Sequence, residues 1–191
     1  MTLLKKKVVI LAGDGNTVYW FRRELISDFQ KIDYEVHVIA PDIKEEFLKT
    51  FHSMEVKFSK LVLKRKTINF LDSFTSFLSI KRILESISPD ILIAYTLKSV
   101  FLSGLCLYFL NIQNSTALIT GTGHIFHNKS SLGKLKKLLV IAALKISMPS
   151  YRLVFFQNPD DRNIFLKYQI VQSNQIRMMN GSGVNLEIFR Q

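Results

Sequence analysis

The stretch Val8-Val9-Ile10-Leu11-Ala12-Gly13-Asp14-Gly15-Asn16-Thr17 decides the fold class. Its first five residues are continuously apolar, which is typical of a strand buried on both faces of a parallel sheet. Two glycines follow within three residues, and residues 17–29 then carry apolar side chains at helical spacing. A buried strand, a glycine loop and a helix form the start of a βαβ unit, so this stretch predicts an α/β domain.

The rest of the chain continues this alternation. Further strands are expected at residues 35–40, 55–59, 91–95, 117–120, 153–157 and 176–179, and further helices at 42–51, 70–87, 99–110, 132–147 and 159–168. Strands that alternate with helices form a parallel sheet with helices on both faces. We therefore predict a Rossmann-like α/β fold with a mainly parallel sheet of about seven strands.

Length and composition limit the class of protein. The chain has 191 residues, of which 48% are hydrophobic and 21% charged, and this suits one globular domain. Its formal net charge of +11 indicates an anionic partner, which is nucleic acid, an anionic membrane surface or a phosphorylated substrate. No nucleic-acid-binding motif is present. With Cys106 as the only cysteine, the chain has no internal disulfide and no zinc-binding cysteine spacing.

Ligands of open α/β sheets bind at the carboxyl ends of the strands. After the first strand, Gly13-Asp14-Gly15-Asn16 offers backbone amides and a helix N-terminus to a phosphate or a sugar, and a plain turn is the alternative. The dinucleotide fingerprint requires a glycine where Val18 stands, which disfavours a nicotinamide-dependent oxidoreductase. After the fourth strand, Lys98 either reaches an anion or is a solvated surface lysine.

Two further loops follow the fifth and sixth strands. Gly121-Thr122-Gly123-His124 combines three small residues, which leave room for a ligand, with an imidazole that is either an acid–base group or structural. Residues 157–161 contain Asn158 and Pro159, which predict a capped helix start. A capped helix is favoured there over a pair of catalytic acids, Asp160 and Asp161.

Residues 129–147 contain five lysines and no acid. On a helical wheel one apolar face is expected to pack on the sheet, and it consists of Leu132, Leu135, Leu139, Ala142 and Ile146. The remaining surface mixes lysines with aliphatic side chains, which predicts an interfacial helix on anionic lipid. The alternative is a buried helix with snorkelling lysines. The predicted membrane-binding residues are Lys134, Lys137, Ile141, Leu144 and Lys145.

Taken in order, these segments resemble family 4 glycosyltransferases of the GT-B fold. The likeness covers essentially the whole chain and is carried by residues 34–41, by Thr120-Gly121-Thr122-Gly123-His124 and by residues 154–161. The most specific stretch is Asn180-Gly181-Ser182-Gly183-Val184-Asn185-Leu186-Glu187-Ile188-Phe189. In the family this stretch enters the interdomain hinge, so the resemblance implies an N-terminal domain at 1–179 and the start of the hinge at 180–191. The bacterial enzymes that extend polyprenyl-diphosphate-linked sugars for surface polysaccharides or glycoproteins are the most similar members.

The resemblance implies a retaining transfer from a nucleotide sugar to a lipid-linked glycan acceptor, with no metal and no further cofactor. The N-terminal domain would bind the acceptor, and the family's paired-glutamate motif belongs to a C-terminal donor-binding domain that this sequence lacks. His124 lies nearest to the histidine that many members place after strand five, and is the candidate catalytic residue.

Three expectations follow for the protein as a whole. The chain alone should be catalytically incomplete and should need a C-terminal GT-B domain, in cis or in trans. It should be cytoplasmic and peripheral on the inner face of the plasma membrane, because it shows no secretory signal and no apolar run of the roughly 18 residues that span a bilayer. The alternative function is a non-catalytic partner that anchors a separately encoded donor domain to lipid.

Overall fold

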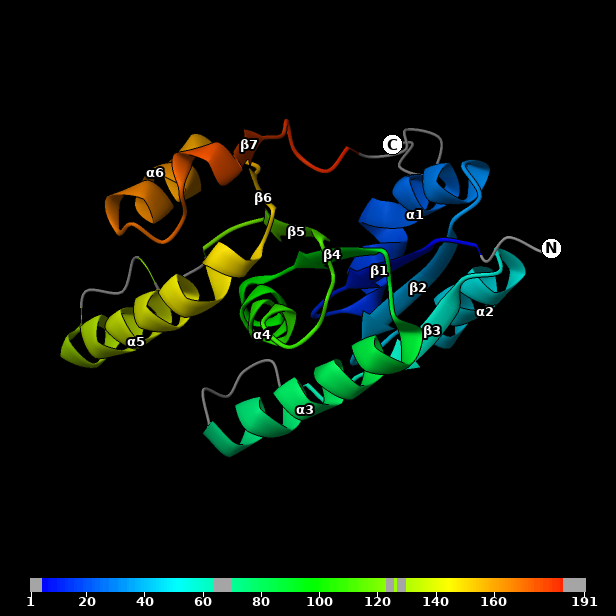
Figure 1. The fold of residues 1–191 in the computed structure, drawn as a ribbon, viewed down its shortest axis with the longest axis horizontal. Coiled ribbons are helices and arrows are strands. Elements are labelled where there is room, and N and C mark those ends of the chain that lie inside the picture. Colours follow the sequence, from blue (N-terminus) through cyan, green and yellow to red (C-terminus); the bar gives the residue numbers. More distant parts are fainter. Residues whose placement is uncertain (1–4, 64–69, 123–125, 127–129, 184–191) are drawn as a thin grey trace.

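A computed structural model describes residues 5–63, 70–122, 126 and 130–183 (Figure 1). The strands are β1 (Lys7–Leu11), β2 (Glu35–Ala40), β3 (Lys57–Lys60), β4 (Ile91–Tyr95), β5 (Asn114–Ile119), β6 (Leu153–Phe156) and β7 (Ile176–Met178). The α-helices are α1 (Gly15–Lys31), α2 (Glu45–Ser53), α3 (Phe70–Ile87), α4 (Leu97–Leu107), α5 (Ser131–Ser147) and α6 (Pro159–Lys167). Short 3₁₀ turns, η2 (Met148–Ser150) and η3 (Ser173–Gln175), precede β6 and β7.

The strands form one parallel sheet in the order β3-β2-β1-β4-β5-β6-β7. β1 is an internal strand: Val8 is in register with Val36 of β2 on one side and with Ile91 of β4 on the other. The chain therefore winds outward in one direction from β1 to β3, and in the opposite direction from β4 to β7. The predicted Rossmann-like, parallel, seven-stranded α/β fold is confirmed, and the predicted elements fall within a few residues of the observed ones.

The reversal of strand order decides which helices cover which face of the sheet. Crossover connections between parallel strands are right-handed, so connections that run in opposite directions place their helices on opposite faces. α1 and α2 pack on one face, with Val8, Ile10 and Val38. α3, α4, α5 and α6 pack on the other face, with residues such as Leu11 and Leu92. We call the four-helix side the closed face and the two-helix side the open face; α1 and α4 mark the two sides in Figure 1.

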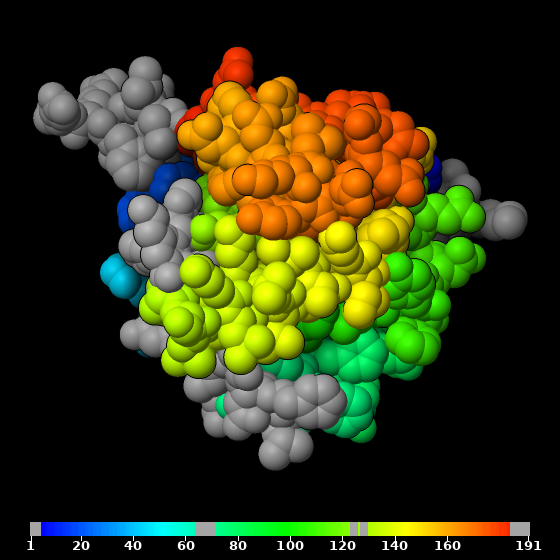
Figure 2. All heavy atoms as spheres, turned by 90° about the vertical axis from the view of Figure 1, so that its left-hand side faces the viewer, coloured from blue at the N-terminus to red at the C-terminus, as the bar shows by residue number. Residues whose placement is uncertain are grey.

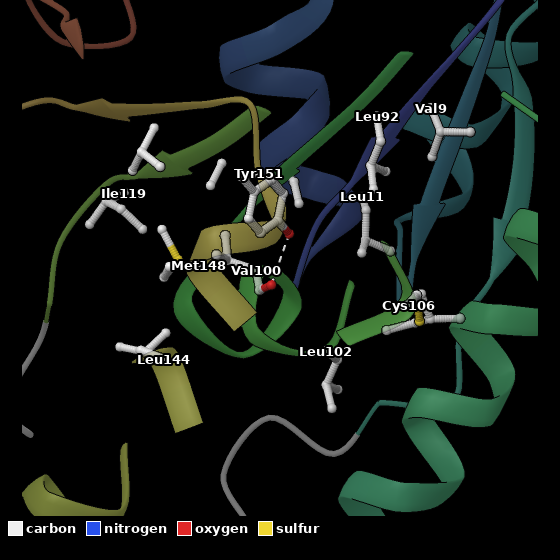
Figure 3. Packing of buried hydrophobic residues seen from close by; sticks show 14 of the residues in the cluster. Val9, Leu11, Leu92, Val100, Leu102, Cys106, Ile119, Leu144, Met148 and Tyr151 are labelled. Carbon is white, nitrogen blue, oxygen red and sulfur yellow. Dashed lines mark hydrogen bonds between the residues drawn. The ribbon is translucent and has the colours of Figure 1, made fainter. Parts of the chain in front are cut away.

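The closed face carries the larger core, part of which Figure 3 shows. Tyr151 is fully buried there, and its hydroxyl donates to the Val100 carbonyl oxygen at 2.8 Å and lies 2.7 Å from the Ser103 hydroxyl. Burial also raises the pKa of the Cys106 thiol to about 12, so this cysteine is a small core residue and not a reactive thiol.

The orientation of α5 corrects the prediction from the helical wheel. Leu132, Leu135, Leu139 and Ile146, expected to pack on the sheet, are all more than half exposed, and Ala142 is exposed as well. Ile141 and Leu144, predicted at a membrane, are buried instead, at 7% and 1% exposure. In Figure 2, α5 lies across the middle of one side of the molecule, below α6.

A close contact between α4 and the end of α5 explains this orientation. A Cβ atom at Gly104 would lie 2.7 Å from the Ser147 carbonyl oxygen and 3.0 Å from the Tyr151 ring. Only a glycine allows this approach, and it turns Ser147, Leu144 and Ile141 toward the core. The sequence offers two apolar stripes on α5, and this tertiary contact selects between them. None of the helices that the structure describes is both long and apolar enough to cross a bilayer.

Candidate functional site

The strand order of the sheet reverses between β1 and β4. Open α/β sheets bind ligands at the carboxyl edge beside such a point. The loop after β1 and the loop after β4 meet there. A Cβ atom at Gly13 would lie 2.8 Å from Thr96 Oγ1, so the first loop requires glycine because the second loop approaches it closely. Close to this contact, the hydroxyls of Thr17 and Tyr95 lie 3.0 Å apart, within hydrogen-bond distance.

Thr96 has an unusual backbone conformation, with φ 73° and ψ 135°. A left-handed φ is a true outlier for a β-branched residue and costs on the order of 1–3 kcal/mol. The start of α4 holds it in place, because the Thr96 carbonyl accepts from the Val100 amide at 2.9 Å and Thr96 Oγ1 donates to Ser99 Oγ at 3.2 Å. Such strain is concentrated at functional positions, which makes Thr96 the residue of interest in this loop. Sequence patterns carry no signal for it.

The predicted phosphate loop at the start of α1 is largely occupied by its own hydrogen bonds. Asp14 caps the helix by accepting from the Asn16 amide at 2.9 Å, and the Gly15 amide donates to the Asp42 carbonyl at 2.8 Å. Asn16 in turn accepts from the Lys44 amide at 2.9 Å. Gly15 is required for packing, since its Cβ would lie 2.7 Å from the Asp42 carbonyl oxygen. The loop is therefore rigid, with a carboxylate at the helix N-terminus.

Lys98 lies in the first turn of α4 and is partly buried. Burial lowers the pKa of its ammonium group, and the Asp72 carboxylate of α3 opposes that shift. The side chain is thus not a freely solvated lysine, and α3 supplies one acid in its surroundings. Its predicted contact with an anion remains a prediction.

The loops after β5 and β6 are joined by Asp161, a link that the sequence did not reveal. Asp161 Oδ1 accepts from the Thr122 amide at 3.1 Å and from the Thr122 hydroxyl at 2.5 Å, and Oδ2 accepts from Asn158 Nδ2 at 2.6 Å. Asn158 also caps α6 by accepting from the Asp161 amide at 2.8 Å, so the predicted helix cap is confirmed. Asp160 is exposed whereas Asp161 is buried, so the two acids do not form a catalytic pair.

The remaining predicted site residues lie near the same edge or outside the described residues. Gly121 and Thr122 follow β5, two strands from β1, which corresponds to about 10 Å across the sheet. Gly123 and His124 belong to the part of the chain that the structure does not describe. Because their loops follow parallel strands at the same edge of the sheet, we expect Gly13, Gly123 and His124 to line one cleft, and this stays a prediction. Within the described ranges, no group of three or more His, Cys, Asp or Glu side chains could hold a metal ion.

A second titratable cluster lies at the opposite, amino edge of the sheet. Glu35 accepts from Lys57 Nζ at 2.7 Å and lies 2.6 Å from His37 Nε2. These hydrogen bonds lower the pKa of the Glu35 carboxyl to about 2. His37 is buried within β2. Because ligands bind at the carboxyl edge, we interpret this cluster as structural.

Comparison with known proteins gives a family and a fold. A family model described as "Glycosyl transferase 4-like" matches residues 7–158. Comparison with curated proteins finds no significant match.

Three solved structures illustrate the fold. Sucrose-phosphate synthase from Thermosynechococcus elongatus superposes with a TM-score of 0.67 at 14% identity, over 96% of this chain and 50% of that one. The lipopolysaccharide outer core galactosyltransferase WaaB superposes with a TM-score of 0.59 at 12% identity, over 90% of this chain and 44% of that one. UDP-GlcNAc 2-epimerase from Neisseria meningitidis, bound to UDP-GlcNAc, superposes with a TM-score of 0.58 at 16% identity, over 90% of this chain and 46% of that one. The chain thus spans about half the length of these proteins.

Proposed function

Because the chain belongs to the glycosyl transferase 4-like family, we propose that it is the acceptor-side half of a retaining glycosyltransferase. The sugar would come from a nucleotide sugar, and the acceptor would be a lipid-linked glycan. The observation that supports this most is the close approach of Gly13 to the strained Thr96, at the point where the strand order reverses. A strained residue at the ligand-binding edge favours a binding role for these two loops over a plain turn.

The chemistry of the side chains near Gly13 favours sugar hydroxyls over a phosphate as the group bound at the first loop. The Asp14 carboxylate already occupies the positive end of α1, and it would repel a second anion. Carboxylate, hydroxyl and amide groups from Asp14, Thr17, Tyr95 and Asn16 gather there and match the donors and acceptors of a sugar. We therefore assign this loop to the acceptor glycan.

The outer surface of α5 supports membrane association. Leu132, Leu135, Leu138 and Leu139 are each more than half exposed, and they alternate along the helix with the exposed Lys134, Lys136 and Lys145. Exposed leucines with interleaved lysines match an interfacial helix on anionic lipid. Lys137 is engaged within the protein instead, 4.9 Å from the Tyr168 ring centroid. A peripheral position on the cytoplasmic membrane face would bring the loops at Gly13 and Thr96 toward a lipid-linked acceptor.

The incomplete-enzyme hypothesis is tested by turnover. The purified chain should transfer no sugar above background from any nucleotide sugar to a polyprenyl-diphosphate-linked acceptor, because a GT-B site lies between two domains. Addition of a donor domain, fused or separate, should restore transfer, and Gly13→Val should reduce the restored rate by about tenfold or more. Robust transfer by the 191-residue chain alone would contradict the proposal. If the chain recruits the donor domain to lipid while Gly13→Val leaves transfer unchanged, it is a non-catalytic anchoring partner.

Membrane association is tested by sedimentation with vesicles that contain anionic lipid. Lys134→Glu/Lys136→Glu/Lys145→Glu should weaken binding by on the order of fivefold per lysine at low salt. The matched control, Lys5→Glu/Lys44→Glu/Lys49→Glu, makes the same charge change away from α5 and should retain most of the binding. Equal losses in both triple variants would mean that net charge, and not the α5 surface, drives binding.

A further inference from the structure

An exposed aromatic cluster lies where α4 ends. Tyr108 and Phe109, which directly follow this helix, are 57% and 67% exposed, although both are large and aromatic. The ring centroid of Phe109 lies 6.1 Å from that of Phe77 in α3, which in turn lies 6.5 Å from that of the half-exposed Phe74. We call these four residues the aromatic patch. A contiguous apolar patch that the described residues leave open to solvent marks an interaction surface.

The aromatic patch continues onto α5. Tyr108 Oη donates to the Ile146 carbonyl oxygen at 2.6 Å, which joins the end of α4 to the end of α5. Ile146 is itself more than half exposed, and it belongs to the same outer stripe of α5 as Leu135 and Leu139. Figure 2 shows α5 in yellow, with a green segment that includes part of α4 beside it and part of α3 below it. The patch and the exposed leucines of α5 therefore form one apolar surface on one side of the molecule.

The charge on this side of the molecule favours an anionic partner. Residues 91–159, which include α4 and α5, contain seven basic side chains and no acidic one. The acids of α3 are balanced locally, because Glu85 pairs with Lys81 at 2.6 Å and Asp72 acts on Lys98. An apolar surface bordered by lysines is complementary to an anionic membrane, which has charged headgroups and an apolar interior. A second copy of the chain fits less well, because it would bring two lysine-rich surfaces together.

The aromatic patch can enter an apolar layer without leaving a side-chain hydrogen-bonding group unpaired. Three of its four members are phenylalanines, whose side chains carry no polar atom. The hydroxyl of the fourth, Tyr108, is already bonded to the Ile146 carbonyl oxygen. Burial of a polar group is costly where its hydrogen bonds are lost, and here the hydrogen bond is kept within the protein. Transfer of these rings from water to lipid is therefore favoured by their apolar surface and is not opposed by the hydroxyl.

We propose that the aromatic patch inserts into the acyl layer of an anionic membrane, while the exposed lysines of α5 bind the lipid headgroups around it. This inference rests on the membrane association proposed above, and it adds which part of the surface enters the apolar layer. The two parts of the surface respond differently to salt. At an ionic strength of about 1 M, charge interactions are screened within about 3 Å, whereas salt does not screen the burial of apolar surface. The aromatic patch therefore supplies the salt-resistant part of binding.

A single tryptophan placed in the aromatic patch reports insertion directly. Trp20 is the only tryptophan of the chain, so Trp20→Phe leaves a background without one. Phe109→Trp in this background places the reporter in the patch. Ile32→Trp, at a 64% exposed position at the end of α1, is the matched control on the open face. Each 191-residue chain is mixed with vesicles of phosphatidylcholine and phosphatidylglycerol, whose acyl chains are either unmodified or brominated.

We expect the fluorescence of the Phe109→Trp reporter to shift to the blue on binding, because the side chain leaves water. Brominated acyl chains should quench it severalfold more strongly than the Ile32→Trp reporter, since only the patch reaches the acyl layer. Equal quenching of the two reporters would overturn the proposal. A blue shift that develops with protein concentration in the absence of vesicles would also overturn it, because the patch would then be a self-association surface.

Sedimentation with the same vesicles at about 0.5 M NaCl isolates the salt-resistant part of binding. Phe74→Ser/Phe109→Ser should weaken this binding by about tenfold, whereas the control Ile32→Ser/Val62→Ser should retain it. All four positions are at least half exposed, so the variants stay folded. Equal losses in the two double variants would contradict insertion. If low-salt binding depends on the α5 lysines while Phe74→Ser/Phe109→Ser changes nothing at high salt, insertion is wrong and the membrane association proposed above stands.

Discussion

The two faces of the sheet are built from the same strands, yet the closed face is more completely covered by helices than the open face. Along β6, Phe156 points to the closed face and is fully buried, whereas its neighbour Phe155 points to the open face and lines an apolar groove between α1 and the strands β4 to β6. Both faces are apolar in sequence, as a parallel sheet requires. The difference comes from strand order, which sends four helices to one side and two to the other. Hydrophobicity alone therefore does not show which surface the described chain covers by itself.

The sharpest test of this comparison uses those neighbouring phenylalanines. Phe156→Ala should lower the free energy of unfolding by about 3–5 kcal/mol, because it leaves a cavity in the closed core. Phe155→Ala should cost only about 1 kcal/mol, since its side chain is already partly solvated. Urea unfolding followed by circular dichroism measures both values. Similar losses would show that the open face is as well packed as the closed one.

The contact between α4 and α5 is specific to the closed face. Gly104→Ala should destabilise the chain by about 1–3 kcal/mol, because the new methyl group would overlap the Ser147 carbonyl. In an unconstrained helix the same change is stabilising by roughly 0.5–1 kcal/mol. The sign of the change in the urea midpoint of unfolding therefore distinguishes a tightly packed Gly104 from an unconstrained one. A stabilised variant would mean that α5 is not held against α4 as described.

The N-caps of α1 and α6 allow a matched comparison of the two faces. Asp14→Ala removes the cap of α1 on the open face and should cost about 1 kcal/mol. Asn158→Ala removes the cap of α6 on the closed face together with the hydrogen bond to Asp161, and should cost about 2 kcal/mol. Thermal or urea unfolding of the two single variants compares them. If Asn158→Ala lowers the free energy of unfolding less than Asp14→Ala does, the link between the β5 and β6 loops contributes little to stability.

The smallest expected effect concerns pH. Glu35 and His37 lie on the same side of β2 as Ile39, which belongs to the closed core. The folded pKa of Glu35, about 2, is below its usual 4.5. Its contribution to stability is therefore present above pH 4.5 and is lost as the pH falls toward 2. The effect is modest because the Glu35 side chain is 26% exposed and solvent screens its charge interactions.

Unfolding midpoints measured between pH 6 and pH 2.5 test this effect against Glu35→Gln, which should fall less steeply with acid. If the midpoints of the wild-type chain and of Glu35→Gln fall in parallel with pH, Glu35 is not the group responsible for the loss of stability in acid.

The sequence predicted the fold well, because continuous apolar runs and helical periodicity are local signals. It predicted the wrong face of α5 because that helix has two apolar stripes, and the choice depends on Gly104, which is far away in sequence. It also singled out Lys98, which lies in the first turn of α4, whereas the structure draws attention to Thr96 just before that helix. A left-handed φ at a threonine is imposed by its surroundings and leaves no pattern in composition or spacing.

The buried Asp161 shows the same limit at the candidate site. Asp160 and Asp161 are equivalent as first-turn acids, and the sequence correctly favoured a capped helix over a catalytic pair. Only the fold shows that one of them is exposed while the other holds Thr122 of a neighbouring loop. Residues that act through a partner on another strand are therefore the part of the site that local sequence patterns miss.

The strand order also has a consequence for how the chain folds. Every pair of neighbouring strands is consecutive in sequence except β1 and β4, which are joined by contacts such as that of the Lys7 amide with Asp90, 83 residues apart. Two locally wound blocks, β1 to β3 and β4 to β7, thus meet along one seam. Loop closure over such a separation is entropically expensive and slows folding. We expect the seam to form in the rate-limiting step, so substitutions at Val9 or Leu92 should slow refolding more than equally destabilising changes at the sheet edges.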